Sequence, residues 1–255
     1  MKVFFQRVYL TLIYSLLYCP ILVLILYSIN SSRYSLQWHG FSMHWYHVLF
    51  NDRGLWTAFF NSVFLGLSAS CIATAMSLFA CVHLFLSHRK QHRTFQALLL
   101  LLIVVPDLVF GVALLIFFNV SSIPLGFLSL LIAHITFCIP FVVFMIHNRL
   151  QTVDHNLYLS ALDLGASHFT ALTRVLLPLL WPAILSALLL SFTLSFDDVI
   201  ISYFIAGPDY TILPLTIYSL VRAGVTPELN ALCTITFLMS MVLVVISRKL
   251  TRTQV

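Results

Sequence analysis

The chain has 255 residues, of which 61% are hydrophobic and only 8% are charged, and its formal net charge at pH 7 is +5. A soluble globular domain carries about 25% charged residues, so the composition excludes that class and predicts an integral membrane protein. The positive charge alone would suggest an anionic partner, but we expect no nucleic acid and attribute the basic residues to membrane topology.

Six apolar runs are long enough to cross a hydrocarbon core of about 30 Å, which takes roughly 20 helical residues. Their continuous hydrophobicity excludes a β-barrel, whose strands alternate. We therefore predict an all-α fold, a polytopic membrane protein with six transmembrane helices forming one domain over residues 1–255, with its core at about 56–247. The predicted spans cover residues 8–29, 56–87, 96–119, 125–147, 179–205 and 229–247.

The chain starts with a short basic segment, Lys2 to Arg7, before the first apolar run. No small-residue cleavage site follows that run, so we expect an uncleaved first span rather than a signal peptide.

Lysine and arginine are distributed unevenly between the connections. Ten of the 13 fall on the side that holds both termini and the second and fourth connections, against Arg33, Arg53 and Arg222 on the other side. The positive-inside rule therefore predicts that both termini and the fourth connection are cytoplasmic. A bacterial inner membrane is the expected location, because we find no organellar targeting sequence.

Two connections on the opposite side are long enough to carry structure. The first, Asn30–Leu55, is rich in tryptophan and tyrosine, which suit a membrane–water interface better than a ligand cage. The second, Ala206–Thr226, predicts a short interfacial helix. Thr226 and Pro227 then supply an N-cap and a proline at the first helical position, with Glu228 following. This start explains Glu228 structurally, with direct ligand binding as the alternative.

The fourth connection, residues 148–178, predicts a compact helix-turn-helix. A short helix begins after Asp154, and Gly165 can stop it in a left-handed conformation. Ser167 can cap a second short helix that ends at Leu177, before Pro178. The first helix presents an apolar ridge that fits a groove on another protein or packs under its own bundle. The ridge consists of Leu157, Ala161 and Leu164.

The spacing around Gly165 resembles the loop of bacterial ABC-importer permeases, in which Glu-Ala-Ala, three residues, Gly and nine residues precede Ile-x-Leu-Pro. Here Leu159-Ser160-Ala161 precedes Gly165, and Val175-Leu176-Leu177-Pro178 follows it. In that family the loop inserts into the ATPase subunit and transmits nucleotide-driven closure to the membrane helices. The resemblance implies ATPase coupling by Asp154, Leu159, Ser160, Ala161, Asp163, Gly165, Ala166 and Pro178.

The motif departs from the family pattern at three positions. The family's glutamate is replaced by Leu159, its second residue by Ser160 and its isoleucine by Val175. An ion pair made by that glutamate cannot form here. Docking would therefore depend on shape, on Gly165 and on apolar contact.

Three acidic residues lie inside apolar runs. Asp197 and Asp198 are in the fifth predicted span and Asp107 is in the third. An aspartate at mid-membrane costs about 2.5–3.5 kcal/mol on insertion scales, and such acids usually face a bundle interior or a watery cavity. Either at least one of them lines the route of a cation, or the pair is structural, with the helix broken after Ser195 and an aspartate capping a new segment.

The run from Ser191 through Phe-Asp-Asp-Val-Ile-Ile-Ser, continuing over residues 213–232, looks like the second membrane subunit of spermidine/putrescine importers. Together with the loop, this similarity covers roughly residues 106–247. This resemblance implies a polyamine cargo, and the acids Asp107, Asp197 and Asp198 agree with a polycation. The alternatives are a permease for iron or a phosphonate, an ion-coupled secondary carrier, and a membrane scaffold that transports nothing.

The resemblance also implies an assembly: a homologous second permease subunit, two ATPase subunits, a periplasmic substrate-binding protein and the membrane lipid around them. The chain contains no Gly-x-x-x-x-Gly-Lys-Ser/Thr motif, so ATP and magnesium are expected on the partner ATPase and no cofactor on this chain. We expect a transport subunit rather than an enzyme. His88 and His92 are one turn apart but sit among basic residues, so we expect a cationic surface and no metal site. His83 and His134 are interpreted as packing residues.

Overall fold

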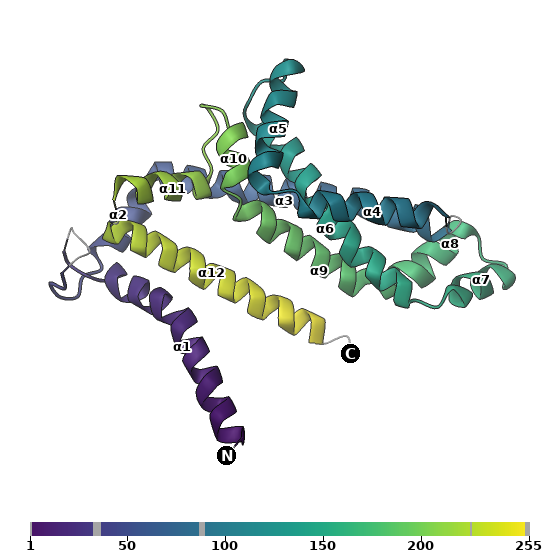
Figure 1. The fold of residues 1–255 in the computed structure, drawn as a ribbon, viewed down its shortest axis with the longest axis horizontal. Helices are drawn as coiled ribbons and strands as arrows, with labels where there is room; N and C mark the ends of the chain where they lie inside the picture. The colour runs from purple at the N-terminus through teal and green to yellow at the C-terminus, as the bar shows by residue number, and fades with distance from the viewer. Residues whose placement is uncertain (1, 33–36, 87–89, 225, 253–255) are drawn as a thin grey trace. The chain divides into compact units, whose positions relative to one another are not determined.

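The computed structural model describes residues 2–32, 37–86, 90–224 and 226–252, and all the regular elements of these residues are helices (Figure 1). The all-α prediction is confirmed. In chain order the elements are α1 (Lys2–Ser28), α2 (His44–Asn51), α3 (Arg53–Leu86), α4 (Lys90–Val104), α5 (Asp107–Val120), α6 (Phe127–Thr152), α7 (His155–Asp163), α8 (His168–Ala171), the π-helical turn η1 (Leu172–Leu176), α9 (Leu177–Phe196), α10 (Ile200–Ile205), α11 (Leu213–Ala223) and α12 (Pro227–Arg252).

Some predictions fall outside the described residues. Arg33, His88 and Arg89 lie there, as does the last residue of the predicted second span, Ser87. The orientation of the termini also stays a prediction.

Contacts divide the chain into two compact units. One consists of Met1–Thr57 and Thr216–Val255, and the other of Ala58–Leu215. The second unit contains all three predicted acids and the whole of the fourth connection. The prediction of one domain over residues 1–255 stays a prediction, because a contact boundary does not say whether either part folds alone.

The predicted count of six spans is not confirmed by the described residues. Four helices there are long and apolar enough to cross a membrane, and the count becomes five if a bent pair is one span. The apolar part of α12, Pro227–Val242, is shorter. The four long helices are Gln6–Ser28, Arg53–Leu86, Phe127–Thr152 and His168–Phe196.

The third predicted span, 96–119, is not one straight helix. It consists of the bent pair Ala97–Val104 and Asp107–Val120, which meet at an angle of 100°. Pro106 causes the break, because proline has no amide hydrogen and disfavours helical geometry in the residue before it. Pro106 is extended, with ψ 137°, and its carbonyl accepts from the Phe110 amide at 3.0 Å to start α5.

The second short helix of the predicted helix-turn-helix does not end at Leu177. Helix α8 continues through η1 into α9 without a break, as far as Phe196. In η1 the Leu177 amide donates to the Leu172 carbonyl, five residues back rather than four. This wider turn accommodates Pro178, whose ring would clash with the preceding turn of a regular α-helix.

Within the second unit, α6 and α9 lie side by side, and α5 and α10 form the end opposite α7 and α8 (Figure 1). Two buried apolar clusters hold this arrangement. The cluster near α7 contains Cys81, Leu99, Val142, Val143, Ile146, Leu150, Leu176, Leu180, Ile184 and Ala187. The cluster near α10 contains Leu65, Phe118, Leu130, Ala133, Ile201, Ile205, Ala206 and Ile212.

The first unit contains the aromatic connection that follows α1. The buried side chain of Asn30 organises it: Oδ1 accepts from the His39 amide at 2.9 Å, and Nδ2 donates to the Gln37 carbonyl at 2.7 Å. Trp45 Nε1 donates to the Asn30 carbonyl at 2.9 Å. Trp45 therefore has a structural partner, while its predicted place at a membrane interface stays a prediction.

The predicted interfacial helix is confirmed as a helix, α11. The predicted start of the last helix is also confirmed, since α12 begins at Pro227 and Thr226 Oγ1 accepts from the Leu229 amide at 3.4 Å. Both elements have local signals: an amphipathic run for α11 and a cap followed by proline for α12.

Gly207, just after α10, has a left-handed backbone with φ +69°, and a Cβ built on it would lie 2.6 Å from the Leu125 carbonyl oxygen. We expect Gly207→Ala to cost about 1–3 kcal/mol, as overpacking usually does, and to lower the thermal unfolding midpoint of the detergent-purified protein. Gly224→Ala is the matched control, because φ is +126° there but nothing lies within 4 Å of the added Cβ. Equal shifts for the two variants would contradict the close approach.

Candidate functional site: an acid-lined cavity and an exposed turn

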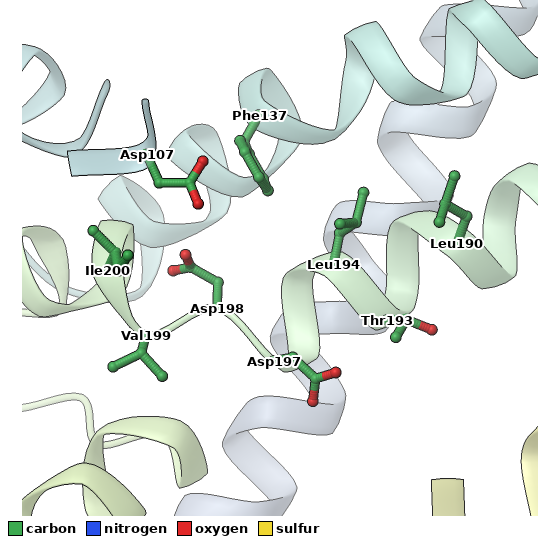
Figure 2. Close-up of a pocket in the computed structure, with 9 residues that line it drawn as sticks. All are labelled: Asp107, Phe137, Leu190, Thr193, Leu194, Asp197, Asp198, Val199 and Ile200. Atoms are coloured by element: carbon green, nitrogen blue, oxygen red, sulfur yellow. The ribbon is translucent and has the colours of Figure 1, made fainter. Parts of the chain in front are cut away.

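The structure brings the three predicted acids together around one cavity of about 380 Å³ (Figure 2). They come from two places in the chain, the start of α5 and the gap between α9 and α10. The rest of the lining is largely apolar. It consists of Phe137, Leu190, Thr193, Leu194, Val199 and Ile200.

The carboxylates do not all point the same way. Figure 2 shows the carboxylates of Asp107 and Asp198 pointing toward one another, while that of Asp197 points away from both. The residues Asp107 and Asp197 are exposed in the single chain, whereas the side chain of Asp198 is only 6% exposed. Neighbouring residues of a chain face different directions, so Asp197 and Asp198 do not present their charge to the cavity equally.

Asp198 caps the short helix α10. Its Oδ1 accepts from the Ile201 amide at 3.3 Å, and its Oδ2 accepts from the Ser202 amide and the Ser202 hydroxyl, each at 2.8 Å. The predicted break after Ser195 is therefore confirmed, one residue later, at the end of α9. Whether the acids also line the route of a cation stays a prediction.

The buried histidine His134, on α6, joins both sides of this break. Its Nδ1 lies 2.6 Å from Ser195 Oγ on α9, and its Nε2 lies 3.0 Å from Ser202 Oγ on α10 and 3.7 Å from Asp198 Oδ2. His134 is 1% exposed, as a packing residue would be, but its hydrogen bonds show a second role that sequence reasoning missed. The sequence held only a weak signal for this role, namely one serine before the two aspartates and one serine after them.

The position of Asp107 depends on the packing of α5 against α10. A Cβ on Gly111 would lie 3.1 Å from Phe204 Cδ2 and 3.3 Å from Ile201 Cα, so this contact is as close as glycine permits. Asp107 is one helical turn before Gly111 and is therefore held opposite the cap of α10. Asp107 also lies in the first turn of α5, where the helix dipole favours an acid.

At the other end of the unit, the predicted turn around Gly165 is confirmed. Asp154 Oδ1 accepts from the Asn156 amide at 2.9 Å at the start of α7. Gly165 has φ +88°, its amide donates to the Leu162 carbonyl at 2.9 Å, and the Ala166 amide donates to the Ala161 carbonyl at 3.0 Å. These two bonds form a Schellman motif, in which only glycine adopts the left-handed position without strain.

The predicted apolar ridge is only partly confirmed. Leu164 is 89% exposed and Leu157 is 48% exposed, but Ala161 is half-buried. The inward face of α7 carries Tyr158, whose hydroxyl lies 2.8 Å from His168 Nδ1. We call the exposed apolar residues of α7, the turn and α8 the turn surface. It consists of Leu157, Leu159, Leu164 and Phe169.

The other residues predicted for ATPase coupling lie in or beside the turn. Ser160, Asp163 and Gly165 are exposed, and Ala166 is half-buried. Pro178 is exposed on the first turn of α9. No group of three or more histidine, cysteine, aspartate or glutamate side chains in the described part of the chain is placed to hold a metal ion; the absence of a metal site stays a prediction.

Residues 54–252 match the family described as binding-protein-dependent transport system inner membrane component. The chain belongs to this family. It is 43% identical to the spermidine/putrescine transport system permease protein PotC of Haemophilus influenzae, over 98% of each chain. It is 43% identical to PotC of Escherichia coli K12, over 96% of this chain and 92% of that protein. It is 36% identical to the putrescine transport system permease protein PotI of E. coli K12, over 89% of this chain and 84% of that protein.

Solved structures share the fold at lower identity. A bacterial ABC transporter involved in the import of the acidic polysaccharide alginate has a TM-score of 0.76 at 15% identity, over 97% of this chain and 95% of that chain. The MetNI methionine ABC transporter in inward-facing conformations has a TM-score of 0.63 at 15% identity, over 79% of this chain and 98% of that chain. Together with the long apolar helices, family membership makes this chain a multi-pass membrane component of a transport system.

The cap formed by Asp198 generates a prediction about local stability. We expect Asp198→Ala to speed amide hydrogen exchange in Ile200–Ile205 by about fivefold, because losing a helix cap costs about 1 kcal/mol. Asp198→Asn retains an acceptor and should exchange more slowly than Asp198→Ala. Asp197→Ala, which removes the neighbouring acid that points away, is the control. Equal exchange in all three variants, measured by mass spectrometry, would show that the cap does not stabilise α10.

Proposed function

We propose that this chain is one permease subunit of an ABC importer for polyamines in a bacterial inner membrane, with both termini in the cytoplasm. The observation that carries this proposal is the pairing of relatives named for spermidine and putrescine transport with a cavity lined by three aspartates, two of whose carboxylates point toward one another. A homologous second permease would complete the pathway, and a periplasmic binding protein would deliver the cargo.

The cavity suits an extended polycation. Spermidine and putrescine carry ammonium groups separated by short methylene chains, so they need carboxylates for the charges and apolar surface for the chains. Asp107 and Asp198 face one another and supply the carboxylates. The leucines and Phe137 in the lining supply the apolar surface. An ion pair is also stronger here than in water, because the surroundings are apolar.

The turn surface suits docking to a soluble ATPase. It is apolar and exposed, and it is fixed by the Asp154 cap, by the Schellman motif and by the predicted cap at Ser167, whose Oγ accepts from the Thr170 amide at 3.2 Å. Little freedom therefore remains to be lost when a partner binds. Leu159 stands where related permeases have glutamate, which makes the proposed contact apolar at that position. Two ATPase subunits would bind ATP and magnesium, and this chain would bind neither and catalyse no reaction.

The connection between the two sites supports alternating access. The helix that begins after Ser167 runs without a break to Phe196, directly before Asp197. Movement of the turn by the ATPases would therefore be transmitted along one rigid element to the acids. The helix bundle would open outward when the ATPases close on ATP.

The deciding experiment measures uptake of labelled spermidine and putrescine by cells that carry the complete transport system. Uptake should be lost when the ATPase subunit is inactivated, and unlabelled polyamines should compete while iron and phosphonates do not. Uptake that persists without ATPase activity and follows an ion gradient would overturn the proposal in favour of a secondary carrier. Competition by iron or a phosphonate alone would overturn the choice of cargo.

The same assay tests the acids. We expect Asp198→Asn and Asp107→Asn each to lower the rate of spermidine uptake about tenfold, which corresponds to about 1.4 kcal/mol, without lowering membrane abundance. Asp209→Asn is the control, because it removes an exposed acid that does not line the cavity. Normal uptake by both cavity variants would contradict a route past these carboxylates.

Gly165 tests coupling to the ATPase. A Cβ at this position meets open space, so only its φ of +88° restricts substitution. We expect Gly165→Val, which disfavours that geometry, to leave ATP hydrolysis running while uptake falls at least tenfold, about 1.4 kcal/mol of coupling. Gly165→Asn is the matched control, since asparagine tolerates a left-handed turn. Normal uptake per ATP hydrolysed in the valine variant would contradict docking at this turn.

A further inference from the structure

The proposed function makes no use of His134, although its buried imidazole has Nε2 3.7 Å from Asp198 Oδ2. The histidine belongs to α6, while its partners belong to α9 and α10. A break in a membrane helix is a place where the chain can bend, and Asp198 stands in that break. Donors of α10 hold the carboxylate of Asp198, and His134 is the group outside α9 and α10 whose hydrogen bonds hold the two sides of the break relative to one another.

The hydrogen-bond roles define one arrangement of protons. The Ser202 hydroxyl donates to Asp198 Oδ2 at 2.8 Å, so Ser202 Oγ can only accept from His134 Nε2, 3.0 Å away. Nε2 must then carry a proton. In the neutral ring, Nδ1 accepts from the Ser195 hydroxyl at 2.6 Å. The result is a directed chain from Ser195 through His134 and Ser202 to the Asp198 carboxylate.

This chain holds both sides of the break at once. Ser195 is in the last turn of α9 and Ser202 is in the first turn of α10. Two donors of Ser202 bind Oδ2 and the Ile201 amide binds Oδ1, and the carboxylate so held points toward Asp107 (Figure 2). Hydrogen bonds to a charged group are stronger than those between neutral groups, so this orientation is held firmly.

We propose that His134 is a positioning residue for cargo transport: through Ser202 it holds the broken helix so that the charge of Asp198 faces the route of the polycation. This inference rests on the proposed function. It predicts an effect that depends on the charge of the cargo, because the interaction with a carboxylate grows with the number of ammonium groups near it. A role confined to packing would affect every cargo equally.

Two substitutions separate the two ends of the imidazole. Gln has its amide nitrogen the same number of bonds from the backbone as Nε2, so His134→Gln keeps a donor for Ser202. Asn reaches only as far as Nδ1, so His134→Asn keeps a partner for Ser195 and loses the link to Ser202. Ser202→Ala breaks the same link from the other side, and Ser70→Ala is the control, because Ser70 is an equally buried serine bonded to its own helix.

The experiment measures uptake of spermidine, a trication, and putrescine, a dication, by the full complex in proteoliposomes with saturating binding protein. We expect His134→Asn and Ser202→Ala to lower spermidine uptake about tenfold, equivalent to about 1.4 kcal/mol, and putrescine uptake less. His134→Gln should recover most of the spermidine rate, and Ser70→Ala should match the unaltered chain. Amide exchange in Ile200–Ile205 should be faster in His134→Asn than in His134→Gln.

A double variant decides whether His134 acts through the aspartate. If it does, adding His134→Asn to Asp198→Asn lowers the spermidine-to-putrescine ratio no further. A fully additive loss, or an equal loss for both cargos, overturns the inference and leaves a packing role. If Asp198→Asn alone leaves both rates unchanged, the proposed route past the acids has failed, and the inference fails with it. Failure of the route is distinguished from failure of the His134 inference alone, because it appears in the Asp198→Asn variant with His134 unchanged.

Discussion

The backbone hydrogen bonds lost at the break between α9 and α10 set the constraint on which the cavity depends. Inside a hydrocarbon layer no water replaces such bonds, so a helix can break only where protein groups take them over. Asp198 does this for the first turn of α10. The position of the carboxylate is therefore set by the backbone amides that donate to it. Whether a cation can reach the carboxylate depends on where those amides lie.

The same constraint explains the other two irregularities. At Pro106 the chain turns by 100° and starts a new helix, and at Pro178 it widens into a π-helical turn and continues. The two prolines differ in the backbone hydrogen bonds of the turn that precedes them. Before Pro178 the Leu177 amide donates to the carbonyl of Leu172, five residues back, so the helix continues. The unbroken helix that results is what joins the turn surface to the acids.

Local sequence signals predicted the local structures well. The cap at Asp154, the left-handed Gly165 and the start at Thr226 each depend on residues within a few positions, and the structure confirms all three. The size of the bend at Pro106 and the continuity through Pro178 could not be predicted, because proline permits a break, a kink or a wide turn and tertiary packing selects among them.

The candidate site was predicted in its residue types but not in its geometry. Three aspartates inside apolar runs indicated a polar interior, yet nothing in their spacing showed that Asp107 faces Asp198 while Asp197 points away. The role of His134 was missed for the same reason. Its partners lie 61 and 68 positions along the chain, and such a contact exists only once α6 packs against the break.

The use of Asp198 as a cap also bears on how tightly it would hold a cation. A carboxylate has about four acceptor sites, and three donors already occupy it: two amides and the Ser202 hydroxyl. About one site remains for an ammonium group, whereas Asp107, exposed at the start of α5, is less committed. A route must bind its cargo strongly enough for entry and weakly enough for release. In the proposed importer, a carboxylate mostly satisfied by its own helix meets both conditions, because it offsets the charge of the polyamine without forming a closed binding site.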